Sequence, residues 1–321
     1  MGFSRDRGQR TLKTRVALSG IGVHSGKPVS ITLCPADPDS GINFVRVDCG
    51  GSPEVEIPAR ANAVGATELC TVLGDPRSIC VATVEHLLAA FAGLGVDNAV
   101  VEIDGPEVPV MDGSARDFVD AIDQAGIAVQ KAPRRIIRVL KPVRVDLGPA
   151  YAEFRPHNRC RFEIGIEYDC PVIGAQSIAV DLTPASFRAD VARARTFGYM
   201  RDVERLWTAG FALGSSLENS VVIGDGAIVN PEGLRYPDEF VRHKALDAIG
   251  DLALAGAPIQ GLYRSFRGGH KLNQMVLAAL LERADAWTIV AEPAEREPRA
   301  EVGRAELPAG LVAPAYAPET I

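Results

Sequence analysis

The sequence predicts an α+β fold assembled from two similar halves. Apolar runs interrupted by turn residues, which are typical of short strands, open each half of the chain. Apolar residues at helical spacing close each half. Because this order occurs twice, we predict a duplicated α+β unit with its boundary near residues 130–135. A proline-rich, basic stretch, KAPRRIIRVLKP at 131–142, marks that boundary.

In the first half, strand patterns surround one strongly apolar helical pattern. The strand patterns cover 12–35, which is typical of a hairpin, 41–73 and 98–104. Residues 83–95 carry apolar side chains at helical spacing, with Thr83 as the expected N-cap. A turn through 105–113 and a helix near 115–126 complete a predicted domain over 1–130.

The second half begins with strands and continues with helices. We expect strands at 136–146, 150–156 and 160–168, and helices near 185–193, 199–209, 238–255 and 270–284. A glycine-rich region at 210–233 separates the helices. The predicted second domain covers 131–297. The tail, 298–321, is rich in Ala, Pro and Glu, and we expect it to be loosely held.

The bulk composition excludes several classes of protein. The chain has 321 residues and a formal net charge of −7, which argues against a nucleic-acid binder because phosphate neutralisation needs a basic surface. No stretch approaches the roughly 20 apolar residues of a membrane-spanning helix, and no signal-peptide pattern follows the basic start. The six cysteines form no CxxC pair. We therefore expect a cytoplasmic protein with free thiols and no transmembrane segment.

Five histidines are present, and two of them lie in patterns that suit metal binding. In the predicted helix 238–255, His243 and Asp247 are four residues apart, close enough to share one metal ion. The same spacing is also typical of a solvated polar face. Glu85 and His86 lie in the first turn of the apolar helix, where a glutamate and a capping histidine also occur without any catalytic role.

Together these residues would suffice for metal-dependent hydrolysis. A catalytic zinc site has three protein ligands and keeps one position for water, and three candidates are present: His86, His243 and Asp247. Glu85 is suited to accept a proton from that water, and His270 to donate one to a leaving amine. The Thr196 hydroxyl would stabilise a developing oxyanion. Spacing alone does not establish this assembly, because its parts are distant in the sequence.

Five longer blocks carry a resemblance to one known family. They are, in chain order, TLKTRVALSGIGVHSGKPV, ATVEHLLAAFAGLGVDNAVVEIDGPEVPVMDGSA, RARTFGYMRDVERL, LRYPDEFVRHKALDAIGDLAL and GGHKLNQ. They span about residues 11–285 and closely resemble successive signature blocks of the UDP-3-O-acyl-N-acetylglucosamine deacetylases. The resemblance implies two related two-layer domains, each a sheet packed on helices, with the active site between them.

The resemblance also implies a reaction, a cofactor and a partner. The reaction is hydrolysis of the 2-acetamido group of UDP-3-O-(3-hydroxyacyl)-N-acetylglucosamine, which releases acetate and UDP-3-O-(3-hydroxyacyl)-glucosamine. This is the committed step of lipid A biosynthesis in Gram-negative bacteria. The implied cofactor is one Zn2+ per chain, at a site that Fe2+ could also occupy. The partner is the acylated UDP-GlcNAc substrate, and we expect a monomer.

By position, the resemblance assigns roles to the residues that match the family's motifs. The implied metal ligands are His86, His243 and Asp247; the implied catalytic residues are Glu85 as base, His270 as acid, Asp251 as the carboxylate that orients His270, and Thr196 as oxyanion stabiliser. The implied substrate-binding or supporting residues are Lys244, Phe197, Tyr168, Cys70, His24 and Asp112. Arg267 departs from the pattern, because it stands where a diphosphate-binding lysine is expected. An apolar passage for the acyl chain is implied within 199–217.

Two other functions remain compatible with the residues taken alone. Two histidines and one carboxylate also form the facial triad of non-haem Fe(II) enzymes. A non-catalytic UDP-sugar-binding protein would use similar polar residues, although it would not need Glu85, His270 and Thr196 together.

Overall fold

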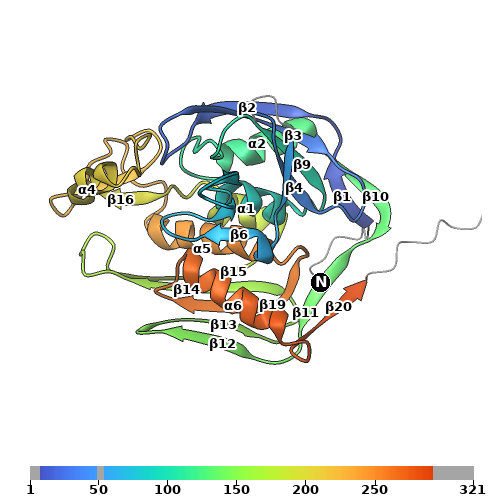
Figure 1. Ribbon diagram of the computed structural model, residues 1–321. Helices are drawn as coiled ribbons and strands as arrows, with labels where there is room; N and C mark the ends of the chain where they lie inside the picture. The colour runs from blue at the N-terminus through green and yellow to red at the C-terminus, as the bar shows by residue number, and fades with distance from the viewer. Residues whose placement is uncertain (1–7, 49–53, 292–321) are drawn as a thin grey trace, which may run out of the picture.

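The computed structural model describes residues 8–48 and 54–291, and within them the α+β prediction is confirmed. Two main sheets face each other across a middle layer of helices (Figure 1). The predicted tail, 298–321, lies outside the described residues. No helix of the described chain is both long and apolar enough to cross a membrane.

The first main sheet has five strands and contains the predicted hairpin. Its order is β2 (Val16–Ile21), β3 (Pro28–Pro35), β9 (Ala99–Ile103), β4 (Ile42–Arg46) and β5 (Val55–Pro58). β2 and β3 pair antiparallel, which confirms the hairpin within 12–35. A small sheet of β6 (Val64–Ala66), β7 (Val72–Gly74) and β8 (Cys80–Val81) lies beside it, after the 3-10 turn η1 (Ala61–Ala63).

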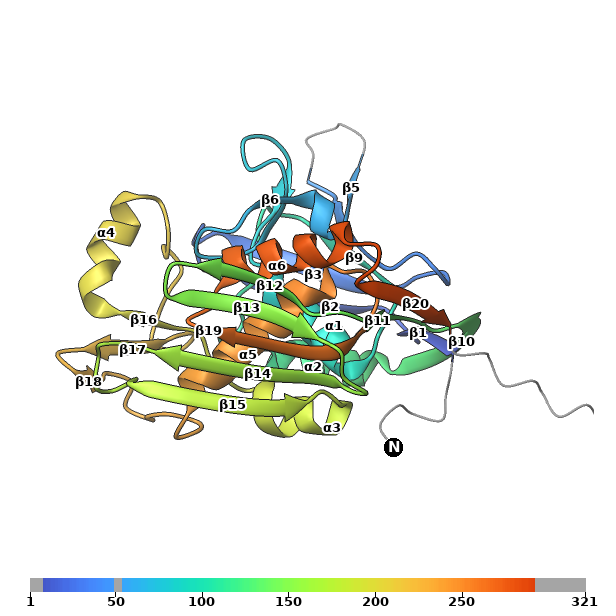
Figure 2. The ribbon, with the colours of Figure 1, turned by 90° about the horizontal axis from the view of Figure 1, so that it is seen from below.

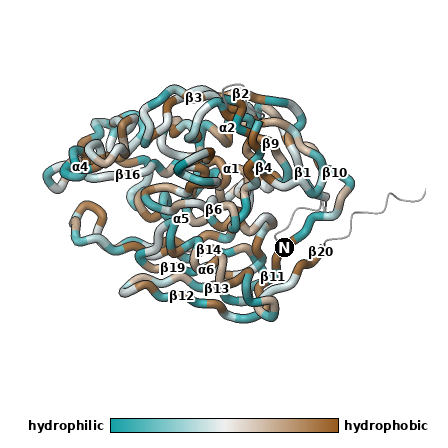
Figure 3. Tube along the Cα trace, in the orientation of Figure 1, coloured by the Kyte–Doolittle hydropathy of each residue, from teal (hydrophilic) through white to brown (hydrophobic). Residues whose placement is uncertain are grey.

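Helix α1 (Glu85–Leu94) lies between the two main sheets, and after Glu85 and His86 its residues are apolar. Nine of its ten residues are buried, and hydrophobic residues dominate this region of the chain (Figure 3). The helix ends at Gly95, whose φ of 76° is easily adopted without a side chain. The prediction that Thr83 caps the helix is wrong: Thr83 has a φ of 57°, and its hydroxyl donates to Glu107 instead. Helix α2 (Arg116–Ala125) confirms the predicted helix near 115–126.

The second main sheet has seven strands and covers the other face of the helices (Figure 2). Its strands are β11 (Arg135–Val139), β12 (Val143–Leu147), β13 (Ala150–Arg155), β14 (Cys160–Glu167), β15 (Ala175–Asp181), β19 (Ile259–Phe266) and β20 (Trp287–Ala291). The predicted strand 136–146 is in fact two strands, since Pro142 has no N–H to continue a ladder. β15, β19 and β20 were not expected.

Helices α5 (Glu239–Ala253) and α6 (His270–Glu282) lie on this sheet and confirm the two predicted C-terminal helices. Between β15 and α5 come the short helices α3 (Pro184–Ser186), η2 (Phe187–Val191), η3 (Met200–Asp202) and α4 (Val203–Thr208). With them lies a small sheet of β16 (Phe197–Tyr199), β17 (Val221–Gly224) and β18 (Ala227–Ile228), within and beside the glycine-rich region. α4 projects to one side of the molecule (Figure 1).

A separate two-stranded sheet joins the two ends of the first half of the chain. β1 (Gly8–Leu12) pairs antiparallel with β10 (Ile127–Pro133), which runs across the predicted boundary at 130. Neither strand belongs to the five- or seven-stranded sheet.

Candidate metal centre

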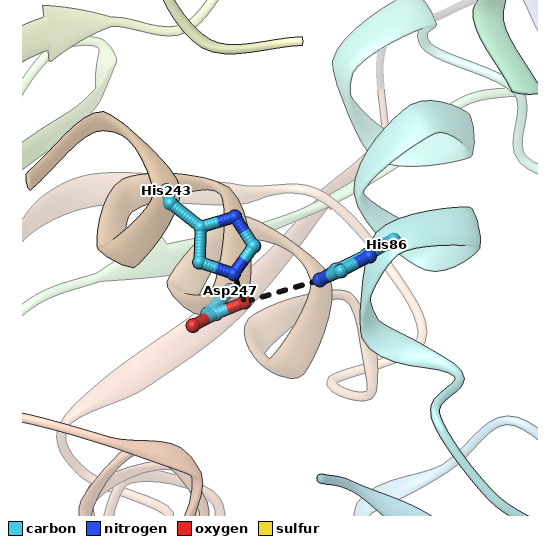
Figure 4. Close-up of side chains that lie close together, drawn as sticks. All are labelled: His86, His243 and Asp247. Carbon is cyan, nitrogen blue, oxygen red and sulfur yellow. Dashed lines mark ion pairs between the residues drawn. The ribbon is translucent and has the colours of Figure 1, made fainter. Parts of the chain in front are cut away.

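The candidate site forms where α1 and α5 pack against each other. Gly250 of α5 makes the contact possible, because a Cβ there would lie 1.9 Å from the backbone oxygen of Glu85. The absence of a side chain lets the two helices approach closely. This brings the start of α1, with Glu85 and His86, alongside the part of α5 that carries His243 and Asp247 (Figure 4).

Three side chains from these helices converge on one point. The Nε2 atoms of His86 and His243 lie 3.6 Å and 3.3 Å from Oδ1 of Asp247. All three residues are buried, and their ligand atoms lie within 4.8 Å of one another. His243 and Asp247 therefore do not belong to a solvated polar face, which was the alternative explanation of their spacing.

The donor set fits a metal ion. Oδ1 of Asp247 is buried and has no hydrogen-bond partner among the described residues, so a bound ion would satisfy it. Nδ1 of His243 lies 3.1 Å from the carbonyl oxygen of Ala194, which favours a proton on Nδ1 and leaves the Nε2 lone pair directed at Asp247. Two atoms each about 2.0–2.1 Å from a tetrahedral ion are about 3.3–3.4 Å apart, close to the spacing observed.

The charges of these groups also suit a cation. Burial lowers the pKa of His243 to about 3, so this imidazole is neutral at neutral pH. Burial opposes ionisation of Asp247, but His243 and Lys244 hold its pKa well below the usual value. Lys244 reaches Oδ2 of Asp247 at 2.7 Å and leaves Oδ1 free. The result is one neutral imidazole and one carboxylate directed at the same point.

A carboxylate and an imidazole flank the three converging atoms. Glu85 is 3% exposed, and burial raises the pKa of its carboxyl. Its Oε2 accepts a hydrogen bond from the backbone N–H of Thr71 at 3.1 Å, which fixes the carboxylate. Its Oε1 lies 3.6 Å from Nε2 of His270, the first residue of α6.

A hydrogen-bond network centred on buried Asp251 fixes the imidazole of His270 through its Nδ1 atom. Oδ2 of Asp251 lies 2.9 Å from Nδ1 of His270 and accepts a bond from Asn273 at 2.8 Å. Oδ1 of Asp251 accepts from the Thr71 hydroxyl at 2.6 Å. Asn273 in turn accepts from the Tyr263 hydroxyl at 2.5 Å. Thr71 and Asn273 were missed in the sequence, although Asn273 lies one helical turn after His270.

These groups open into a cavity of about 380 Å³. Its walls include most of the side chains expected at the site: Glu85, His86, His243, Asp247, His270, Thr196, Lys244, Phe197, Tyr168 and His24. The Lys244 ammonium lies 5.7 Å from the centre of the Phe197 ring, and the Phe197 and Tyr168 rings lie 5.9 Å apart, edge to face. The cavity continues along Tyr199, Val203 and Leu206.

Besides Asp251, three other expected residues lie outside the cavity lining. Arg267 is exposed and pairs with Glu167 at 3.1 Å. Cys70 is 3% exposed, and burial raises the pKa of its thiol. Asp112 is bonded to Arg235 at 2.7 Å. None of these three residues is therefore placed to contact a ligand in the cavity.

These observations describe an α+β protein with a candidate metal centre of two histidines and one aspartate, beside a carboxylate–imidazole pair formed by Glu85 and His270. Known proteins narrow this description. The model of the LpxC family, UDP-3-O-acyl N-acetylglycosamine deacetylase, matches residues 9–282. Proteins named UDP-3-O-acyl-N-acetylglucosamine deacetylase from Brucella ovis, Brucella abortus and Brucella melitensis are 53% identical over 283 residues, which cover 88% of this chain and 98% of each relative.

The chain therefore belongs to the UDP-3-O-acyl N-acetylglycosamine deacetylase family. The family is one of hydrolytic enzymes, so the alternatives of a non-catalytic sugar-nucleotide-binding protein and of an oxygen-dependent iron enzyme are set aside. The resemblance noted in the sequence is confirmed.

Proposed function

We propose that this protein hydrolyses the 2-acetamido group of UDP-3-O-(3-hydroxyacyl)-N-acetylglucosamine to acetate and the free amine, the committed step of lipid A biosynthesis. One observation carries the proposal: Nε2 of His86, Nε2 of His243 and the unpartnered Oδ1 of Asp247 converge on one point, and all three residues line the cavity of about 380 Å³. Family membership supplies the substrate class.

The same three residues would hold Zn2+, and two imidazoles with one carboxylate also suit Fe2+. When bound, such an ion supplies Lewis acidity that polarises the amide carbonyl and acidifies water. The raised pKa of Glu85 suits a group that accepts a proton from the attacking water at neutral pH. Its carboxylate is already fixed by the Thr71 N–H, so no reorientation is needed.

His270 would donate the second proton. Burial acts to lower its pKa, but Asp251 and Glu85 outweigh burial and raise the pKa to about 10, so the imidazole is charged at neutral pH. Its Nδ1 faces Asp251, which leaves Nε2 to protonate the departing nitrogen. The bond between the carbonyl carbon and that nitrogen breaks, and the amine leaves neutral.

Thr196 and Lys244 would act on the substrate directly. The backbone N–H of Thr196 donates to Gly113 at 2.8 Å, its carbonyl oxygen accepts from Val221 at 2.7 Å, and the residue lines the cavity. Its hydroxyl would donate a hydrogen bond to the tetrahedral oxyanion. Lys244, Phe197 and Tyr168 line one wall, where a cation and two rings suit the sugar nucleotide. His24 also lines the cavity, and its backbone N–H donates a hydrogen bond to Glu107.

The acyl chain would follow the apolar continuation of the cavity. Tyr199, Val203 and Leu206 line it, and exposed Met200, Trp207 and Leu213 lie on neighbouring positions of the same segment. Exposed apolar residues of this kind are common at ligand entrances. We also propose that the chain acts as a monomer in the cytoplasm and divides into domains at 1–130 and 131–297.

Acetate release tests this function. The purified, zinc-loaded protein should release acetate from the 3-O-acylated sugar nucleotide and far less from the unacylated one. A chelator should abolish the activity, and added Zn2+ should restore it. A metal-loaded protein that leaves the acetamide intact would show that the proposed function is wrong.

A further inference from the structure

A second cavity lies along the C-terminal halves of α1 and α5, the two helices that carry the candidate metal ligands. It has a volume of about 100 Å³ and shares no lining residue with the first cavity. Its apolar walls come from α1, α5 and the seven-stranded sheet: Leu88, Phe91, Ile249, Leu252, Phe154 and Phe162. Protein interiors are close-packed, so an apolar space at this junction suggests room for a ligand.

One charged group in this cavity has no counter-ion. The guanidinium of Arg60 is half-buried and makes no hydrogen bond or ion pair with any residue in 8–48 or 54–291. It lies over two glycines: a Cβ at Gly41 would lie 2.7 Å from Nη2, and a Cβ at Gly256 would lie 1.2 Å from Nη1. Any larger residue at Gly256 would displace the guanidinium of Arg60. The glycine therefore leaves the space that this guanidinium occupies.

The other charged groups on the walls are already satisfied. Asp97 is the acidic residue that faces the cavity, and it is bonded to Arg134 at 2.9 Å and to the backbone N–H of Arg10 at 2.9 Å. Arg161 is paired with Glu163 and Asp181. The walls therefore carry an excess positive charge, and Arg60 is its source. A guanidinium cannot lose its proton in a protein, and even a half-buried guanidinium is partly removed from water, so a counter-ion would stabilise it.

We propose that this cavity binds a small apolar carboxylate, of the size of benzoate or hexanoate, through Arg60. The carboxylate would accept two hydrogen bonds from the guanidinium, and the apolar part would fill the space between Phe91 and Leu252. The walls favour a carboxylate over phosphate. The one unpaired guanidinium can neutralise a single negative charge, and the apolar side chains offer no hydrogen bonds to the remaining phosphate oxygens. The site is separate from the deacetylase centre, so the proposal does not depend on the proposed reaction.

Fluorine NMR titration of the metal-loaded, full-length protein tests this. The probes are 4-fluorobenzoate and its neutral analogue 4-fluorobenzyl alcohol. Arg60→Met should weaken binding of the carboxylate by about tenfold or more and leave the alcohol unaffected. Ala92→Leu, which fills the cavity from α1, should weaken both probes. Arg77→Met, with a side chain that is 92% exposed, is the matched control and should change neither.

Two results would overturn the proposal. If the carboxylate bound at the metal centre instead, Arg60→Met and Ala92→Leu would leave its affinity unchanged. If another part of the chain already filled the cavity, the full-length protein would bind neither probe. Because binding is measured directly, loss of deacetylase activity plays no part in either outcome.

Discussion

Asp251 and His270 form a pair in which the carboxylate oxygen Oδ2 of buried Asp251 lies 2.9 Å from Nδ1 of the partly buried imidazole. The two residues come from different helices, α5 and α6. Asp251 is the main group that counters burial and keeps His270 protonated. Thr71 and Asn273 bond the same carboxylate, so its position is fixed before any substrate arrives.

Replacing Asp251 by Asn should change the pH dependence of the reaction. A protonated acid is lost as the pH rises through its pKa, so activity falls on the alkaline side. Without the Asp251 charge, the pKa of His270 should drop from about 10 toward its ordinary value. We expect the alkaline limb of kcat/KM to move down by about one pH unit or more. An unchanged alkaline limb, with full metal content, would contradict this role.

Glu85→Gln should separate metal binding from turnover. The amide keeps the shape of the carboxylate but cannot accept a proton, so we expect kcat to fall by about 10²–10⁴-fold. Elemental analysis should find the same metal content as in the unsubstituted protein. Activity within a few-fold of normal would remove Glu85 from the role of base.

His243→Ala should lower the metal content. The substitution removes one of three converging ligand atoms, and the metal-to-protein ratio after dialysis should fall well below that of the unsubstituted protein. His157→Ala is the matched control, because His157 bonds Arg159 away from the cavity. Equal zinc in both variants would refute the ligand assignment.

Thr71→Val should lower the stability of the protein as well as its rate of turnover. The hydroxyl donates to a buried carboxylate oxygen at 2.6 Å, and its loss leaves that oxygen unpaired. We expect the free energy of unfolding in urea to fall by about 1–3 kcal/mol. Thr71→Ser retains the donor and should recover most of the loss. If valine and serine behaved alike, the hydrogen bond would not be the cause.

Leu206→Glu should discriminate between acylated and unacylated substrates. The residue lines the cavity beside Tyr199 and Val203, and a charge there would have to be desolvated beside an acyl chain. We expect KM to rise at least tenfold for the acylated substrate and to change little for the unacylated one. Leu217→Glu, at a position that is 41% exposed and outside the lining, serves as control.

Much of the fold could be predicted from local pattern, and the exceptions have physical reasons. The helices α1, α5 and α6 were expected, because their apolar spacing is long and regular. β19, at the centre of the second sheet, was missed. Its buried face includes Gly261 and Ser265, while Leu262 and Phe266 lie on the less buried face, so the expected apolar alternation is absent.

The catalytic candidates were found from residue type and family resemblance, but their supporting groups were not. Nothing in the spacing of Thr71 points to Asp251, which lies on a helix of the other half. Arg60 was missed for a similar reason, because the significance of a lone arginine depends on whether a counter-ion lies near it.

The amino-acid sequence was sufficient to show which residue types are available, roughly where the main helices lie, and which family the chain resembles. Tertiary structure alone decided that His86 meets His243 and Asp247, and that these groups are buried. The reason is that ligand geometry depends on the packing of α1 against α5, two helices far apart in the chain. That packing requires a bare backbone at Gly250, which no local pattern reveals.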